Sequence, residues 1–129
     1  MINKSHFILY VKDQEISTEF YSNFLDLSPT LNVPGMTEFS LSENTVLGLM
    51  PEKGIENLLN KKVSVVTNTY NSIKAEIYLL VNSIDQYVER AKKQSVKILS
   101  EAENRDWGDR TAYFLDPDQH VIAIAEKIS

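Results

Sequence analysis

Apolar residues in the first fifty positions form short runs and one helical stripe. Residues 7–11 and 45–50 are apolar runs, and residues 37–42 alternate between apolar and polar side chains. Runs of this length and alternation predict β-strands. Over residues 14–24 the apolar side chains recur about every four positions, which predicts a helix. With a further short strand over residues 30–33, this half of the chain has the order β-α-β-β-β.

The second half repeats that order of elements. An apolar stripe at helical spacing predicts a helix over residues 84–91. Strands are predicted over residues 75–81, 96–99, 111–115 and 120–125. The repetition indicates a fold built from two similar modules.

Polar residues mark the predicted ends of these elements. Asp13 can cap the first helix, because its side chain can accept a hydrogen bond from a backbone N–H of the first turn. Ser83 begins a Ser-x-x-Gln pattern that has the form of a capping box. Residues 101–106 are predicted as a loop.

The segment between the two halves is less regular. Residues 55–59 predict one helical turn, and residues 63–67 predict a short strand before a polar stretch. We therefore interpret residues 51–73 as a connector, which is long for a segment without regular structure.

A turn separates the last two predicted strands. Pro117 presets φ for the second position of a type I turn, and Asp116 can accept hydrogen bonds from the backbone that follows it. Asp118 lies in the same turn. Because carboxylates in turns are usually solvated, we assign neither aspartate a catalytic role.

The closing part of the chain resembles a known superfamily. It has a Trp-Gly-x-Arg sequence at residues 107–110, an aromatic strand, an Asp-Pro-Asp turn and a final apolar strand that ends in Glu126. This combination resembles the closing hairpin of the vicinal-oxygen-chelate superfamily. That superfamily contains glyoxalases, extradiol dioxygenases, fosfomycin-inactivating enzymes and bleomycin-resistance proteins, and the lead-in most resembles the bleomycin-resistance branch.

The resemblance implies an α+β fold in which two β-α-β-β-β modules form a curved mixed sheet. The chain is then one domain over residues 1–129, with modules at 1–50 and 74–129 joined by the connector. Members of the superfamily usually carry glycine where this chain has Gln119, and glycine suits a left-handed backbone. Gln119 therefore implies slight strain or a different type of turn.

Alternation along the strands assigns side chains to faces. His6 and Tyr10 share one face of the first strand, and Glu76 and Tyr78 share one face of the strand that opens the second module. We expect these mixed faces to line the concave side of the sheet, since ligand pockets are largely apolar surfaces with a few polar groups. The alternative is that the tyrosines lie at the rim of the sheet with their hydroxyls in water.

The closing hairpin adds two aromatic candidates. Strand alternation directs Tyr113 into the same cavity, and the resemblance places Trp107 at its mouth. Trp107 has a second interpretation as ordinary packing under its loop. The predicted ligand-binding residues are His6, Tyr10, Met50, Glu76, Tyr78, Trp107 and Tyr113.

The resemblance also implies where metal-dependent members of the superfamily hold their ion. The corresponding positions in this chain are His6, Gly48, Glu76 and Ala123. A divalent ion needs at least three protein ligands, and Gly48 and Ala123 have no donor atoms. We therefore expect neither a metal nor another cofactor. Glu38 is a possible substitute donor, whereas alternation directs His120 away from the cavity.

Composition excludes several classes of site and argues against others. The 129-residue chain has a net charge of −5 and no cysteine. The charge argues against a nucleic-acid surface, and the lack of cysteine excludes disulfides, thiolate metal sites and cysteine nucleophiles. We find no signal peptide and no run of apolar residues long enough for a membrane helix, and expect a cytoplasmic protein without a membrane partner.

The remaining choice is between binding and catalysis. His6 and Glu76 could act as an acid–base pair, although such pairs are more often structural hydrogen bonds. We predict a protein that sequesters an antibiotic-like, aromatic or cationic small molecule without a metal, and the resemblance implies a homodimer. The alternatives are a metal-dependent lyase, isomerase or dioxygenase, and a dimeric module that has no ligand of its own.

Overall fold

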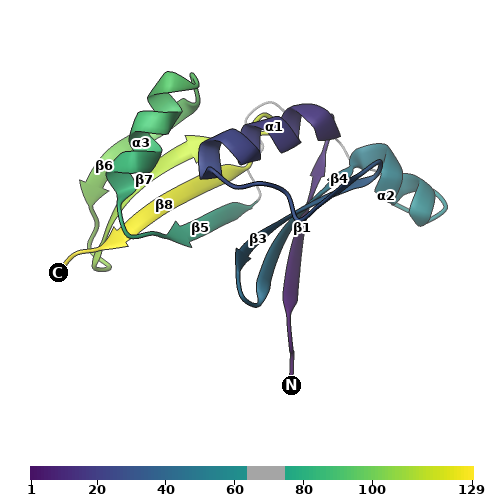
Figure 1. The fold of residues 1–129 in the computed structure, drawn as a ribbon, viewed down its shortest axis with the longest axis horizontal. Coiled ribbons are helices and arrows are strands. Elements are labelled where there is room, and N and C mark those ends of the chain that lie inside the picture. Colours follow the sequence, from purple (N-terminus) through teal and green to yellow (C-terminus); the bar gives the residue numbers. More distant parts are fainter. Residues whose placement is uncertain (64–74) are drawn as a thin grey trace. The chain divides into compact units, whose positions relative to one another are not determined.

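The computed structural model describes residues 1–63 and 75–129, and its first half contains a four-stranded sheet (Figure 1). The strands lie in the order β1-β4-β3-β2, and only β1 and β4 pair in parallel. The elements of this half are β1 (Ser5–Val11), α1 (Gln14–Leu25), β2 (Leu31–Val33), β3 (Met36–Ser42), β4 (Thr45–Pro51) and α2 (Glu52–Leu58).

The second half forms another four-stranded sheet with the equivalent order, β5-β8-β7-β6. Here β5 and β8 are parallel and the other pairs are antiparallel. Its elements are β5 (Glu76–Leu80), α3 (Ile84–Lys93), β6 (Lys97–Asn104), β7 (Asp109–Leu115) and β8 (Val121–Lys127). The predicted α+β fold of two β-α-β-β-β modules is confirmed, with one mixed sheet in each module.

The described residues fall into two compact units that differ from the modules in one respect. Asn23–Leu25, at the end of α1, belong to the second unit. The Phe24 ring makes edge-on contacts with Phe114 and Tyr87, at centroid distances of 5.0 and 6.3 Å. Arg90 Nε also donates to the carbonyl oxygen of Phe24 at 3.0 Å. The last turn of α1 therefore contributes to the core of the second unit.

The core of the first unit lies on one face of its sheet. Val11, Phe39, Leu47 and Leu49 share this face and are buried. Tyr21 on α1 packs against Phe39 with a centroid distance of 6.4 Å. The apolar face predicted from strand alternation is thus the face that packs against the helix.

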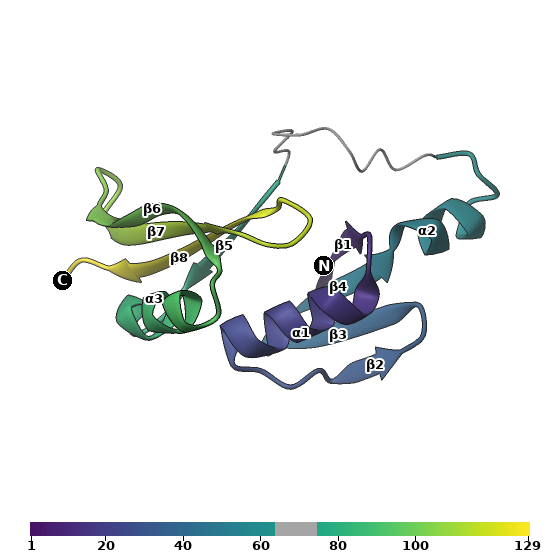
Figure 2. The ribbon, with the colours of Figure 1, turned by 90° about the horizontal axis from the view of Figure 1, so that it is seen from above.

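The core of the second unit has the same construction. Ile122 and Ile124 on β8 are fully buried, as are Phe114 on β7 and Ile84 on α3. Figure 2 shows α3 lying along one face of this sheet, and α3 packs against β7 and β8. The opposite face of the sheet carries the tyrosines and the acidic residues considered below.

The two helix starts differ from each other. The side chain of Asp13 accepts a hydrogen bond from the Ile16 backbone N–H at 3.0 Å, so the predicted cap is confirmed. The predicted capping box is wrong, because the Ser83 side chain makes no cap hydrogen bond. Asp85 in the first turn of α3 provides negative charge near the helix N-terminus instead.

The polar segment after Leu99 is a strand rather than the predicted loop. β6 continues to Asn104, and Glu103 pairs with Thr111 on β7. The pairing shifts twice, between Ile98 and Ser100 and between Ser100 and Glu103. Bulges of this kind interrupt alternation, so the sequence pattern does not reveal that the strand continues.

The connector contains α2, which is longer than the predicted turn over residues 55–59. Most of the strand predicted over residues 63–67, and the polar stretch after it, lie outside the described residues.

The closing turn is more ordered than turn composition suggests. Asp116 is buried, which contradicts the expectation of a solvated carboxylate. Its Oδ1 accepts hydrogen bonds from the backbone N–H groups of Asp118 and His120 at 2.9 and 2.8 Å, and its Oδ2 lies 2.7 Å from His120 Nδ1. Gln119 has a φ of 67°, so the left-handed conformation expected at this position is present without glycine.

Candidate functional site

The face of the second sheet that is turned away from α3 is built around small residues of β8. Ala123 pairs with Tyr78 on β5 and with Tyr113 on β7, so the two tyrosines flank it. Glu76 lies one row further along the same face, where it pairs with Val121. We call the surface formed by Glu76, Tyr78, Trp107 and Tyr113 the aromatic face.

The Tyr78 hydroxyl is the centre of a hydrogen-bond network on the aromatic face. It donates to Asp109 Oδ2 at 2.6 Å and accepts from Trp107 Nε1 at 2.9 Å. Thr111 Oγ1 lies 3.2 Å away. A phenol has one hydrogen to donate, and Asp109 already accepts it. A ligand would therefore meet the ring of Tyr78 rather than a free hydroxyl donor.

Asp109 anchors this network from a buried position at the start of β7. The hydrogen bond from Tyr78 lowers the pKa of Asp109, burial opposes that effect, and Lys127 lowers the pKa further. Lys127 Nζ lies 3.4 Å from Asp109 Oδ1 and forms an ion pair with it. Asp109 is thus a carboxylate at neutral pH and holds the phenol in one orientation.

Trp107 lies in the tight connection between β6 and β7. Gly108 has a φ of 93°, a conformation that glycine adopts without steric cost. The connection is closed by a hydrogen bond from Arg105 N to Asp109 O at 2.8 Å. The Trp107 side chain is not packed under the loop, since the residue is 54% exposed while its indole N–H is bonded to Tyr78.

Tyr113 lies beside a cation, Arg105, that the sequence pattern did not predict. The guanidinium carbon of Arg105 lies 5.2 Å from the centroid of the Tyr113 ring. Burial raises the pKa of Tyr113, Glu76 and Tyr78 raise it further, and Arg105 lowers it. Tyr113 is consequently neutral over the physiological pH range and has charged neighbours of both signs.

The other three predicted site residues lie in the first unit. Tyr10 on β1 pairs with Met50 on β4, and both share a face with His6. His6 Nδ1 lies 3.5 Å from Glu38 Oε2, so Glu38 is the carboxylate beside His6 in this unit.

Two of the four positions that the resemblance assigns to metal ligands, Gly48 and Ala123, have no donor atom. A side chain at Gly48 would begin 3.1 Å from Ile8 Cγ1 and 3.4 Å from Met36 Sδ. A donor side chain at this position would therefore require Ile8 and Met36 to shift. Within residues 1–63 and 75–129, no group of three or more His, Cys, Asp or Glu side chains is arranged to hold an ion.

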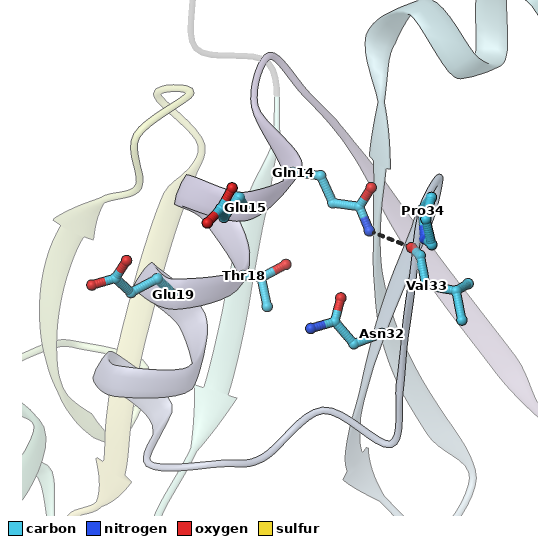
Figure 3. Close-up of a pocket in the computed structure, with 7 residues that line it drawn as sticks. All are labelled: Gln14, Glu15, Thr18, Glu19, Asn32, Val33 and Pro34. Carbon is cyan, nitrogen blue, oxygen red and sulfur yellow. Dashed lines mark hydrogen bonds between the residues drawn. The ribbon is translucent and has the colours of Figure 1, made fainter.

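A separate cavity of about 490 Å³ lies in the first unit (Figure 3). Figure 3 shows Gln14 extending from α1 to the backbone of Val33, where its Nε2 donates to the carbonyl oxygen at 2.8 Å. Gln14 Oε1 accepts from Gly35 N at 2.9 Å, so this side chain ties the β2–β3 hairpin to the helix. The cavity is lined by Gln14, Glu15, Thr18, Glu19, Asn32, Val33 and Pro34, none of which was a predicted site residue.

Comparison with known proteins supports the assignment made from the fold. The sequence profile of the glyoxalase-like domain matches residues 5–129. The chain belongs to the glyoxalase-like domain family. This membership, with the paired β-α-β-β-β modules, places it in the vicinal-oxygen-chelate superfamily.

Two curated relatives are fosfomycin resistance proteins FosX, from Listeria innocua and Listeria monocytogenes. Each is 28% identical to this chain over 120 residues, covering 93% of this chain and 86% of the relative.

Solved structures of similar fold include a glyoxalase/bleomycin resistance protein/dioxygenase from Nocardioides. It has a TM-score of 0.81 and 20% identity, covering all of this chain and 85% of that chain. The hypothetical protein SA1046 from S. aureus has a TM-score of 0.74 and 26% identity, covering 98% and 94% of the two chains.

In the described parts of the glyoxalase-like chain, no helix is long and apolar enough to cross a membrane.

Proposed function

We propose that this glyoxalase-like protein binds an aromatic or cationic organic molecule on its aromatic face and sequesters it without a metal. The observation that carries the proposal is the network joining Trp107, Tyr78 and Asp109. A half-exposed indole that is hydrogen-bonded in one orientation is a preorganised contact surface, because less conformational freedom is lost when a ligand binds.

The energetics favour ligands with flat or positively charged groups. An aromatic pair contributes about 0.5–1.5 kcal/mol beyond the burial of its area. A cation over an aromatic ring contributes about 0.5–2 kcal/mol, depending on its desolvation. Glu76 is exposed on the same face and adds attraction for a cation.

The donor set supports binding without a metal. A side chain at Gly48 would be crowded by Ile8 and Met36, and Ala123, between the two tyrosines, has no donor atom. Residues that could activate a substrate through a metal are therefore missing at two of the four positions implied by the superfamily. We extend the proposal to a homodimer in which a second chain helps to cover the bound molecule.

Fluorescence of Trp107 provides a direct test, since it is the only tryptophan in the chain. Titration with a panel of antibiotics, including bleomycin and fosfomycin, should give saturable quenching or a spectral shift for a true ligand. Tyr113→Ala should weaken that ligand's affinity at least about tenfold, equivalent to about 1.4 kcal/mol. Tyr113→Phe is the matched control and should retain binding, because it keeps the ring. A ligand whose affinity is the same in all three proteins does not bind at the aromatic face.

A second candidate function is metal-dependent inactivation of fosfomycin. It is favoured by the similarity to FosX, which extends over 93% of this chain. The purified protein should be incubated with fosfomycin and either Mn²⁺ or Zn²⁺, and fosfomycin should be followed by phosphorus NMR. We expect no turnover. Loss of fosfomycin that requires the ion, together with one tightly held ion per chain, would establish a metal-dependent fosfomycin-inactivating enzyme in place of the binding protein.

A further inference from the structure

Arg105 is held rigidly at the edge of the aromatic face. Its Nη2 donates to Ser100 Oγ at 2.8 Å and to the Thr111 carbonyl oxygen at 2.9 Å. Its guanidinium group also lies over the Tyr113 ring. The side chain is only 19% exposed, so its planar donor group is fixed before any ligand arrives.

The hydrogen-bond donors of Arg105 are only partly used. A guanidinium has five N–H groups, and those on Nη2 have close acceptors. Among the described residues, the buried Nε has no acceptor, and the only acceptor of Nη1 is Glu103 Oε2 at 3.5 Å. The positive charge of Arg105 is therefore weakly compensated, and donors remain for a further acceptor.

Glu103 occupies the place where such an acceptor would bind. Its Oε2 lies 3.5 Å from Arg105 Nη1 and 3.3 Å from Ser100 Oγ, and both distances are long for bonds to a charged group. The Glu103 side chain is 65% exposed. An exposed ion pair of this kind contributes little to stability, so its carboxylate is easily displaced.

We propose that Arg105 and Ser100 form a binding subsite for the oxyanion of a ligand, and that Glu103 is an internal occupant which the ligand displaces. The inference rests on the proposed function and defines its ligand class further. The ligand carries a carboxylate or phosphonate beside the group that contacts Tyr113. Because Glu76 is exposed on the same face and has the opposite charge, an amphoteric ligand fits this face best.

The test compares two probes that differ in one group. Hydrocinnamate has a phenyl ring and a carboxylate, and hydrocinnamyl alcohol has the same ring and chain without the charge. Affinities are measured by NMR of nitrogen-labelled protein, from the Ser100 amide, Arg105 Nε and Trp107 indole signals. Inorganic phosphate is titrated separately, as an oxyanion without an aromatic group.

Glu103→Gln is the decisive variant, because it removes the internal carboxylate without touching the fold's core. Glu101→Gln is its matched control, since Glu101 is also exposed on β6 and accepts from Arg105 through its backbone carbonyl oxygen, which the substitution keeps. We expect the acid to bind about fivefold or more tightly than the alcohol, because the charge strengthens the hydrogen bond. Glu103→Gln should tighten binding of the acid by about threefold more than Glu101→Gln does, and should not affect the alcohol.

The outcomes separate the subsite from the proposed function. Equal affinity for acid and alcohol, with no difference between the two glutamine variants, would overturn the oxyanion subsite and leave the aromatic face as a binding surface. Saturable shifts of Ser100 and Arg105 with phosphate, without binding of either aromatic probe, would support the subsite and count against the aromatic face. No shift of Ser100 or Arg105 with any probe would overturn the subsite.

Discussion

The Tyr78 hydroxyl shows how one polar group can organise a surface. It joins an exposed indole to a buried carboxylate, so a substitution of Asp109 should alter the orientation of the Trp107 side chain. The aspartate itself is on the same face as the tyrosines, because β7 pairs with β8 in a register that alternates Asp109, Thr111 and Tyr113 on one side.

The first prediction concerns the pH dependence that Asp109 confers. The Tyr78 hydrogen bond lowers the folded-state pKa of Asp109, so its stabilisation is present above the ordinary aspartate pKa and is lost as the pH falls through the lowered value. Below about pH 4, Asp109→Asn should lose free energy of unfolding less steeply than the natural protein. Urea unfolding followed by circular dichroism at several pH values measures this. Parallel pH profiles for the two proteins would contradict the assigned role.

A second prediction concerns the buried carboxylate of Asp116. Asp116→Ala leaves two backbone N–H groups of the closing turn without their acceptor. Loss of such a buried, charged acceptor should lower the free energy of unfolding by about 2–4 kcal/mol. Asp106→Asn, in the exposed turn before Trp107, should change it by less than about 0.5 kcal/mol. Similar urea midpoints for the two variants would show that the Asp116 bonds contribute little.

Several residues of the site were predictable from the sequence, but the hydrogen bonds and ion pairs among them were not. Strand alternation alone placed Tyr78 and Tyr113 on one face. It did not identify Arg105 or Asp109, because their partners depend on the register between β6, β7 and β8. The burial of Asp116 was also missed, since an Asp-Pro-Asp sequence gives the same turn signal whether or not a histidine side chain covers it.

At the scale of elements, the two helix starts offer a matched comparison. Asp13 accepts a cap hydrogen bond and Ser83 does not. Asp13→Ala should therefore lower the free energy of unfolding by about 1 kcal/mol, whereas Ser83→Ala should change it by only a few tenths. Chemical denaturation of both variants measures the difference. Equal losses would mean that the Ser83 hydroxyl caps its helix in solution.

Element order was predictable because each strand is a short apolar or alternating run. The exception is β6. Its polar second half pairs with β7 through bulges, so its side chains do not alternate between apolar and polar. Gln119 illustrates the reverse case. The resemblance indicated a left-handed backbone at this position. Gln119 adopts it, although this conformation costs glutamine more free energy than it costs glycine.

At the scale of the whole molecule, each sheet leaves apolar side chains uncovered on the face opposite its helix core. Ile8 and Tyr10 are exposed on the first sheet, and Tyr78 and Leu80 on the second. Exposed apolar surface of this kind favours association. Together with the resemblance, it leads us to predict that the protein is a homodimer.

Sedimentation equilibrium at micromolar concentration should then give about twice the chain mass of 14.7 kDa. Leu80→Glu should shift the equilibrium toward single chains, because it replaces a 55%-exposed leucine on β5 of the second sheet with a charged residue. Ile16→Glu makes the same change at a 56%-exposed position on α1 and should leave the mass unchanged. A single-chain mass for the natural protein would remove the second copy from the proposed ligand site. An equal shift in both variants would place the interface elsewhere than on the sheet.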